Sequence, residues 1–401
     1  MTPEFNGFLL LSVVKILVVF TVYNVGVMMV IWAERRVSAW KQMRLGPNRV
    51  GPAGLLQSLA DGLKNIMKEE TWPAEANRPL FLLAPMLSFV PALIVWAVIP
   101  FAAPMPVDFD FAVWGMHFVH HGPMPMVVAD LPIGFLYILA IGSLGVYGIV
   151  LAGWASNSKY AFLGGLRASA QMVSYEVSMG FSIVTILILA GNVTLSEIIR
   201  QQQESVWFIF ALSFGFVLFF ISALAENNRL PFDLPETESE LVTGYHTEYS
   251  SMKFSMFFIA EYAHIITGSS LLATLFFGGW DIPFLPAPAE PTVLYSLATL
   301  AMFSLKVLFF IYVYIWIRWT LPRFRFDQLM ALGWKLMLPM ALGYVLVIAT
   351  AVQALDALGW GLGTRSGLVL FGLNLVILVV VFGWFDRGRI LSGTRYRRVE
   401  T

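Results

Sequence analysis

Two glutamates lie inside long apolar stretches of this 401-residue chain. Glu176 lies about seven residues, and Glu261 about six residues, after the start of an expected membrane span, and both spans are entered from the same side. With a helical rise of 1.5 Å per residue, both lie roughly 10 Å deep. Ionisable groups at this depth are costly and usually functional, so the pair indicates a functional site inside the membrane. For each acid, a helix-end residue paired with a nearby base is the alternative.

The segment 225–254 is unusually acidic. A solvated acidic loop is one interpretation, but its interleaved leucine, phenylalanine and tyrosine residues favour a partly buried segment. Buried carboxylates that repel one another would have raised and coupled pKa values. These acids lie on the same side of the membrane as Glu176 and Glu261, which is consistent with a chain of carboxylates that leads from a cytoplasmic cavity into the membrane. The six acids of the segment are Glu226, Asp233, Glu236, Glu238, Glu240 and Glu248.

Glu34, Arg35 and Arg36 follow the first apolar stretch, beside Trp40. Basic residues and a tryptophan at this position fit a simple anchor at the cytoplasmic interface. A carboxylate next to two guanidinium groups fits equally well in a polar cavity that receives a carbonyl headgroup. The residue types leave both interpretations open.

Residues 53–70 carry leucine, isoleucine and methionine at helical spacing, with Asp61 and Lys64 on the opposite face. This periodicity predicts an amphipathic helix that lies at the membrane interface. The helix either floats on lipid headgroups or covers an opening through which an apolar tail passes. Composition does not distinguish these two roles.

Metal and nucleotide sites are not indicated. The cluster His117, His120 and His121 could bind a metal on one helical turn, but the prolines and glycines around it argue against a helix. Glu261 and His264 form a single E-x-x-H pair, whereas di-iron bundles use two such pairs. The chain has no cysteine and no phosphate-binding glycine motif, so it offers no thiolate ligand and no NADH or ATP site.

Composition requires a membrane environment. Hydrophobic residues make up 58% of the chain and charged residues 12%, against about a quarter charged in soluble domains. The net charge is zero, which gives no attraction for nucleic acid. Stretches of roughly 20 apolar residues predict an all-α bundle with about nine spans, in a single membrane domain over 1–401. The expected spans lie near 8–32, 80–103, 129–153, 169–190, 206–225, 255–279, 293–317, 335–354 and 367–385.

Basic residues predict the orientation of this bundle, because lysine and arginine collect in cytoplasmic loops. Alternate loops and the C-terminal tail hold 21 of the 25 basic residues. We therefore expect the N-terminus outside and the C-terminus in the cytoplasm. The first span has no basic residue before it and no cleavage site, which is typical of a retained helix and not of a signal peptide. A bacterial inner membrane fits the chain length and the basic tail.

Three inner loops resemble a known family. AERRVSAWKQMRLGPNRVGP at 33–52 and the segments at 153–176 and 225–254 are similar to the signatures of the quinone-site membrane subunit of respiratory complex I, the proton-pumping NADH:quinone oxidoreductase. The likeness runs in order from about residue 30 to 265, and the later spans fit mainly by hydropathy.

The resemblance implies a subunit that binds the hydrophilic arm of the complex through its inner loops. Antiporter-like membrane subunits and the lipid bilayer are its other expected neighbours. Quinone, either ubiquinone or menaquinone, is the implied substrate. FMN and iron–sulfur clusters are implied for partner subunits, with no cofactor held by this chain.

Two groups of residues fall on the motifs of that family. Where some relatives place a further glutamate in the third span, this chain has Ser143, which leaves the inner end of the path open. The expected quinone-binding residues are Glu34, Arg35, Arg36, Asp61, Lys64, Arg229 and Phe232. The expected proton-path residues are Glu176, Glu226, Asp233, Glu236, Glu238, Glu240, Glu248 and Glu261.

Other functions remain open at this stage. The equivalent subunit of a membrane-bound hydrogenase, or of a complex with another electron donor, would share the acidic path. A free-standing secondary transporter is a third alternative, but it typically has paired repeats, which this sequence lacks. The completeness of the 33–52 loop favours the quinone enzyme.

Overall fold

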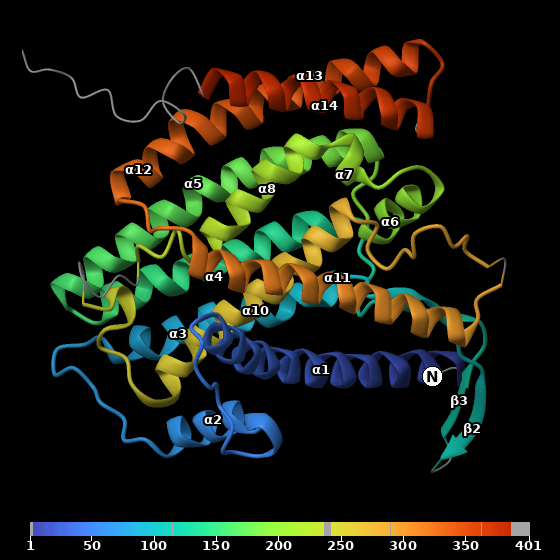
Figure 1. Cartoon of the computed structure of the whole chain (residues 1–401). Helices are drawn as coiled ribbons and strands as arrows, with labels where there is room; N and C mark the ends of the chain where they lie inside the picture. Colours follow the sequence, from blue (N-terminus) through green and yellow to red (C-terminus); the bar gives the residue numbers. More distant parts are fainter. Residues whose placement is uncertain (1–2, 114–115, 236–241, 289, 362, 386–401) are drawn as a thin grey trace, which may run out of the picture.

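The computed structural model is a bundle of long helices with nearly parallel axes (Figure 1). The structure describes residues 3–113, 116–235, 242–288, 290–361 and 363–385. Within these ranges eight helices are long and apolar enough to cross a membrane, which confirms the all-α membrane bundle. They are α1 (Pro3–Lys41), α3 (Arg78–Ile94, continued by η2, Val95–Val98), α4 (Gly134–Ala155), α5 (Lys159–Ala190), α10 (Ser251–Phe276), α11 (Val293–Thr320), α12 to α13 (Phe326–Ala357) and α14 (Thr364–Phe385).

The expected span at 206–225 is a broken helix. It consists of α7 (Phe208–Ala211) and α8 (Ser213–Glu226), which are separated at Leu212. The side chain of Asn374 on α14 accepts a hydrogen bond from the Phe214 amide at 3.1 Å and donates one to the Ala211 carbonyl at 2.7 Å. Backbone polar groups inside a membrane need such partners, so this buried asparagine stabilises the break.

The expected outer loop 104–128 forms two small antiparallel sheets. Strand β1 (Ala102–Pro106) pairs with β4 (Pro123–Met126), and β2 (Phe109–Val113) pairs with β3 (Met116–His120). The hairpin of β2 and β3 lies against the start of α1 (Figure 1). A Cβ at Gly7 of α1 would overlap the carbonyl of Val119, so this contact requires glycine.

Irregular segments and short helices join the long ones. The short helices are η1 (Pro52–Gly54), α2 (Gln57–Met67), α6 (Leu195–Glu204) and η3 (Gly244–His246). Residues 332–337 form a single wide turn between α12 (Phe326–Ala331) and α13 (Leu338–Ala357). Helices α3, α4 and α5 pack at the centre, and there Gly148 of α4 leaves room for Ser88 of α3.

Candidate functional site: a buried ionic network between one large and two small cavities

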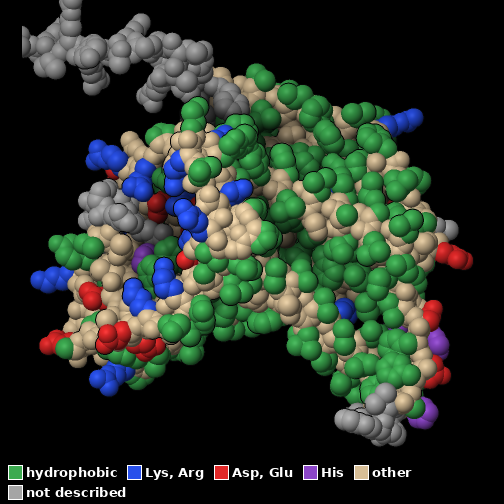
Figure 2. Space-filling model, turned by 60° about the horizontal axis from the view of Figure 1, so that its bottom comes forward, with side chains coloured by type: hydrophobic (Ala, Val, Ile, Leu, Met, Phe, Trp, Pro, Cys, Tyr) green, Lys and Arg blue, Asp and Glu red, His purple; other side chains and the backbone are tan. Residues whose placement is uncertain are grey.

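Lysine, arginine, aspartate and glutamate gather at one end of the bundle, and apolar side chains cover most of the visible face beyond it (Figure 2). This end contains α2 and the ends of α1 and α11 that lie away from the hairpin (Figure 1). Segments that are distant in the sequence, namely the ends of α1 and α11 and the helix α2, therefore lie at the same end of the bundle (Figure 1).

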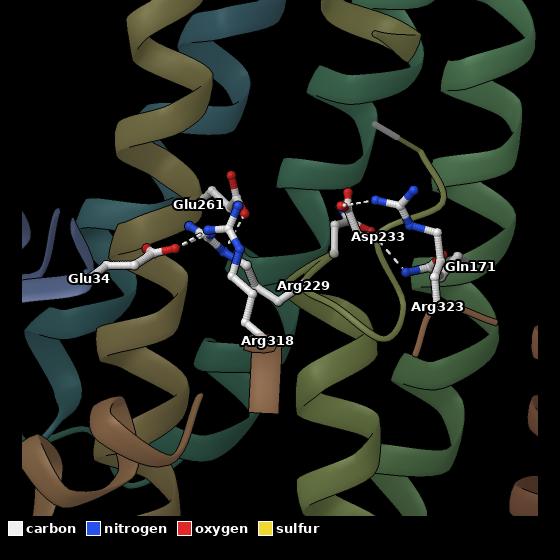
Figure 3. A network of polar contacts seen from close by, with 8 residues as sticks. Glu34, Gln171, Arg229, Asp233, Glu261, Arg318 and Arg323 are labelled. Carbon is white, nitrogen blue, oxygen red and sulfur yellow. Dashed lines mark hydrogen bonds and ion pairs between the residues drawn. The ribbon is translucent and has the colours of Figure 1, made fainter. Parts of the chain in front are cut away.

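Arg229 is at the centre of a buried ionic network (Figure 3). Its Nη1 lies 3.3 Å from Glu34 Oε1, and its Nε lies 2.6 Å from Glu261 Oε1. Arg318 of α11 forms a second ion pair with Glu34. The Arg229 guanidinium also lies over the ring of Tyr262, 4.5 Å from its centroid. These contacts join Arg229, which was expected to bind quinone, to Glu261, which was expected to belong to the proton path.

Hydrogen bonds from α5 hold the segment that carries Arg229. The amide of Gln171 donates to the carbonyls of Ala225 and Phe232, both at 2.8 Å, and to Asn228 Oδ1 at 3.1 Å. The Phe232 ring is buried between the rings of Tyr175 and Phe324. Phe232 therefore supports the segment from within the core.

Asp233, four residues beyond Arg229, forms a second ion pair of the same segment. Its Oδ2 lies 3.0 Å from Nη2 of Arg323, which follows α11. The carboxylate is largely buried, whereas the guanidinium is 38% exposed. The structure thus places Asp233 at the border between the buried network and the loop surface (Figure 3).

Arg35 and Arg36 contact other partners than Glu34 does. Arg35 forms an ion pair with Asp61 of α2, and Asp61 also lies 3.9 Å from Lys64. Arg36 instead donates to the carbonyl of Pro47, at 3.3 Å, and so fastens the loop after α1. The three consecutive residues therefore face the buried network, the amphipathic helix and the loop in turn.

Residues of α1, α2 and α10 line a cavity of about 780 Å³. Leu59, Leu63 and Ile66 of α2 line its apolar side, and Arg35 and Asp61 contribute charges. Tyr262 also lines it, and the guanidinium of Arg229 lies over the ring of this tyrosine. The large cavity thus adjoins the buried network.

Two much smaller cavities lie deeper in the bundle. One, of about 40 Å³, is lined by Glu176 and Glu226, and the other, of about 30 Å³, by Glu226 and Glu261. A space of about 10–15 Å³ holds one water molecule, so each cavity is large enough for water. Glu226 lines both cavities, and the three glutamates therefore form a connected series.

One expected path residue, Glu248, does not join this series, because it is half-buried and lines none of these three cavities. Ser143, which stands where some relatives have a glutamate, hydrogen bonds within its own helix to the carbonyl of Ala140. Glu236, Glu238 and Glu240 lie outside the described residues. Among the residues that are described, no group of three or more histidine, aspartate or glutamate side chains could hold a metal ion.

The family model described as NADH dehydrogenase matches residues 14–349. This chain belongs to the NADH dehydrogenase family. It is 49% identical to a subunit of NADH-quinone oxidoreductase from Koribacter versatilis, over 86% of this chain and 98% of the relative. Identity is also 49% to an NADH-quinone oxidoreductase subunit from Rhodospirillum centenum (86% and 94% covered) and to NADH-ubiquinone oxidoreductase chain 1 of Chondrus crispus (85% and 97%). The matched region thus extends well beyond residue 265, where the motifs recognised in the inner loops end.

Four residues of the site were not predicted from the sequence. Arg318 and Arg323 belong to a basic loop that we interpreted only as an indicator of orientation. Gln171 lies within the second recognised motif but carries no charge. His264 was considered only as a metal ligand, yet it lines both small cavities.

Proposed function

We propose that this chain is the membrane subunit of a proton-translocating NADH:quinone oxidoreductase, in which it forms the quinone-access cavity and the acidic path that couples quinone reduction to proton pumping. One observation carries the proposal: Arg229 bridges Glu34 and Glu261, and it contacts Tyr262 of the large cavity as well as Glu261 of a water-sized cavity. The names of the relatives supply the reaction and its substrates.

The large cavity suits a molecule with an apolar tail and a polar head. Its volume falls within the 300–1,000 Å³ typical of ligand pockets. The leucines of α2 would contact an isoprenoid tail. Arg35 of α1, together with Asp61 and Lys64 of α2, would meet the carbonyl headgroup. Ubiquinone and menaquinone both fit this description.

Electrostatics would link the quinone to the path. Reduction consumes two electrons from a partner subunit and two protons, and it adds negative charge to the headgroup before the protons arrive. An anion near Arg229 competes with Glu34 and Glu261 for the guanidinium. A Glu261 that loses its cation binds a proton more readily, and the water-sized cavities carry that change to Glu226 and Glu176.

The proposed function also implies the partner subunits of this chain and its orientation in the membrane. FMN and iron–sulfur clusters belong to partner subunits, and the hydrophilic arm binds at the end that carries the ionic residues. Trp40 in the last turn of α1, and Met43 and Leu45 after it, are strongly exposed there and offer an apolar contact for it. Antiporter-like subunits would contact the lateral faces. The bundle lies in a bacterial inner membrane, with the N-terminus outside and the C-terminus in the cytoplasm.

Glutamine at Glu176 or Glu261 tests the path, because it keeps hydrogen bonding but exchanges no proton. In the assembled complex, Glu176→Gln and Glu261→Gln should each lower proton pumping and quinone-linked turnover about tenfold or more. Oxidation of NADH by artificial acceptors should stay normal. Glu197→Gln on α6, whose partner is the nearby Arg200, is the control that should behave as wild type. Normal pumping by both path variants would refute the proposed path.

A further inference from the structure

Glu226, Asn227 and His264 are the three residues that line both small cavities. A proton that moves from the Glu261 cavity to the Glu176 cavity must pass this boundary. Asparagine does not exchange protons under ordinary conditions, which leaves a carboxyl and an imidazole. The proposed path uses Glu226 but gives His264 no role.

The imidazole of His264 faces α4. Its Nε2 lies 3.7 Å from the position that a Cβ would take on Gly145. The α4 residues that line the two cavities are apolar: Phe135, Ile138, Leu139, Gly142, Gly145 and Ile149. On this side of the boundary, His264 is therefore the titratable group among the lining residues.

We propose that His264 is a second proton carrier between the two small cavities, beside Glu226. This inference rests on the proposed function of the acidic path. A neutral imidazole accepts a proton at one ring nitrogen and releases the proton of the other, so its net charge is unchanged and the ring is left as the other tautomer. When Glu261 later releases the proton that it bound, the ring accepts this proton and releases its other proton to water next to Glu176.

The groups around the ring suit this role. Glu176 on α5, Glu226 on α8 and Glu261 on α10 are the acidic residues that line the cavities with it, and Tyr245 on η3 also borders one of them. Nearby carboxylates stabilise a transient imidazolium. The helices α3 and α4 add Ser88 and apolar residues but no charged group to the lining.

Two substitutions in the assembled complex separate a proton carrier from a structural histidine. His264→Gln keeps a hydrogen-bonding side chain that cannot carry a proton, and His264→Glu restores proton exchange. We expect His264→Gln to lower quinone-linked turnover and proton pumping about tenfold, with the KM for quinone unchanged. We expect His264→Glu to recover at least half of both activities.

His246→Gln is the matched control. His246 is also buried, and burial lowers the pKa of its imidazole to about 4, but it packs against Phe254 and Phe258 and lines neither small cavity. NADH oxidation by artificial acceptors reports whether each complex is assembled. Wild-type pumping by His264→Gln, or equal losses in the Gln and Glu variants, would overturn the inference. Wild-type pumping by Glu261→Gln would instead remove the path on which it rests.

Discussion

At the scale of single residues, Arg229 is the most constrained side chain of the network. It is 9% exposed and lies between two carboxylates that are 8% and 11% exposed. Taking a charge out of water costs several kcal/mol, and only close opposite charges offset that cost. Loss of the guanidinium would leave Glu34 with Arg318 alone and Glu261 without the cation that lies 2.6 Å from it.

Arg229→Met should therefore destabilise the subunit by about 3–5 kcal/mol, the usual cost of breaking a buried ion pair. Arg323→Met, at the more exposed pair with Asp233, should cost about 1 kcal/mol or less. Thermal melting of the purified complex, together with its yield, measures both effects. Equal losses in the two variants would show that the burial of Arg229 carries no special cost.

At the scale of elements, α2 is an amphipathic helix with few contacts on its apolar face. Leu59 and Leu63 are more than half exposed, although they lie beside the large cavity. Two polar contacts hold the helix to α1: Arg35 binds Asp61, and the Ser58 hydroxyl donates to the Met28 carbonyl at 2.8 Å. On the side of α10, the Ser251 hydroxyl donates to the carbonyl of Asn65 at 2.8 Å. The helix is thus held to both α1 and α10, and its exposed leucines can border an opening.

Gly62 allows a direct test of this border. It lines the large cavity, and a Cβ at this position would meet no atom within 4 Å. Gly62→Trp should fill part of the cavity without moving the backbone, and we expect it to raise the KM for long-tailed quinones several-fold more than for short-tailed ones. Steady-state kinetics with both substrates give this comparison.

Met67→Trp adds the same side chain to α2 at an exposed position that does not line the cavity. It should change the KM for long-tailed and short-tailed quinones equally. If Gly62→Trp also affects both substrates equally, the large cavity is not the entrance for the tail.

At the scale of the whole molecule, charge is distributed unevenly between the two ends of the bundle. One end carries most of the visible lysine and arginine side chains (Figure 2). Helix α2 lies toward this end, and the hairpin lies at the opposite end (Figure 1). The positive-inside rule then predicts which end faces the cytoplasm. An apolar bundle that is charged mainly at one end has one favoured orientation.

Single cysteines can measure this orientation, since the chain has no cysteine of its own. Phe284, between α10 and α11, is fully exposed, and Leu45, after α1, is 84% exposed. An impermeant thiol reagent should label Phe284→Cys in right-side-out vesicles and Leu45→Cys in inside-out vesicles stripped of the hydrophilic arm. Labelling from the opposite sides would invert the proposed topology.

The sequence by itself determined the features that depend on neighbouring residues. Membrane spans follow from runs of apolar residues, and the amphipathic α2 follows from helical periodicity, because both are local properties. Glu176 and Glu261 were predicted as functional for a similar reason: an acid within an apolar run is visible without any fold. Family motifs added the residues around Glu34 and Arg229.

Only the tertiary structure decided which charges meet. Glu34 and Arg318 are 284 residues apart in the chain, and Glu34 and Arg229 are 195 apart, so no spacing rule connects them. The broken helix at Leu212 likewise depends on Asn374, 160 residues beyond Phe214. Ion pairing and hydrogen bonding depend on distances of a few ångströms in space, and helix packing sets those distances between segments that the sequence keeps far apart.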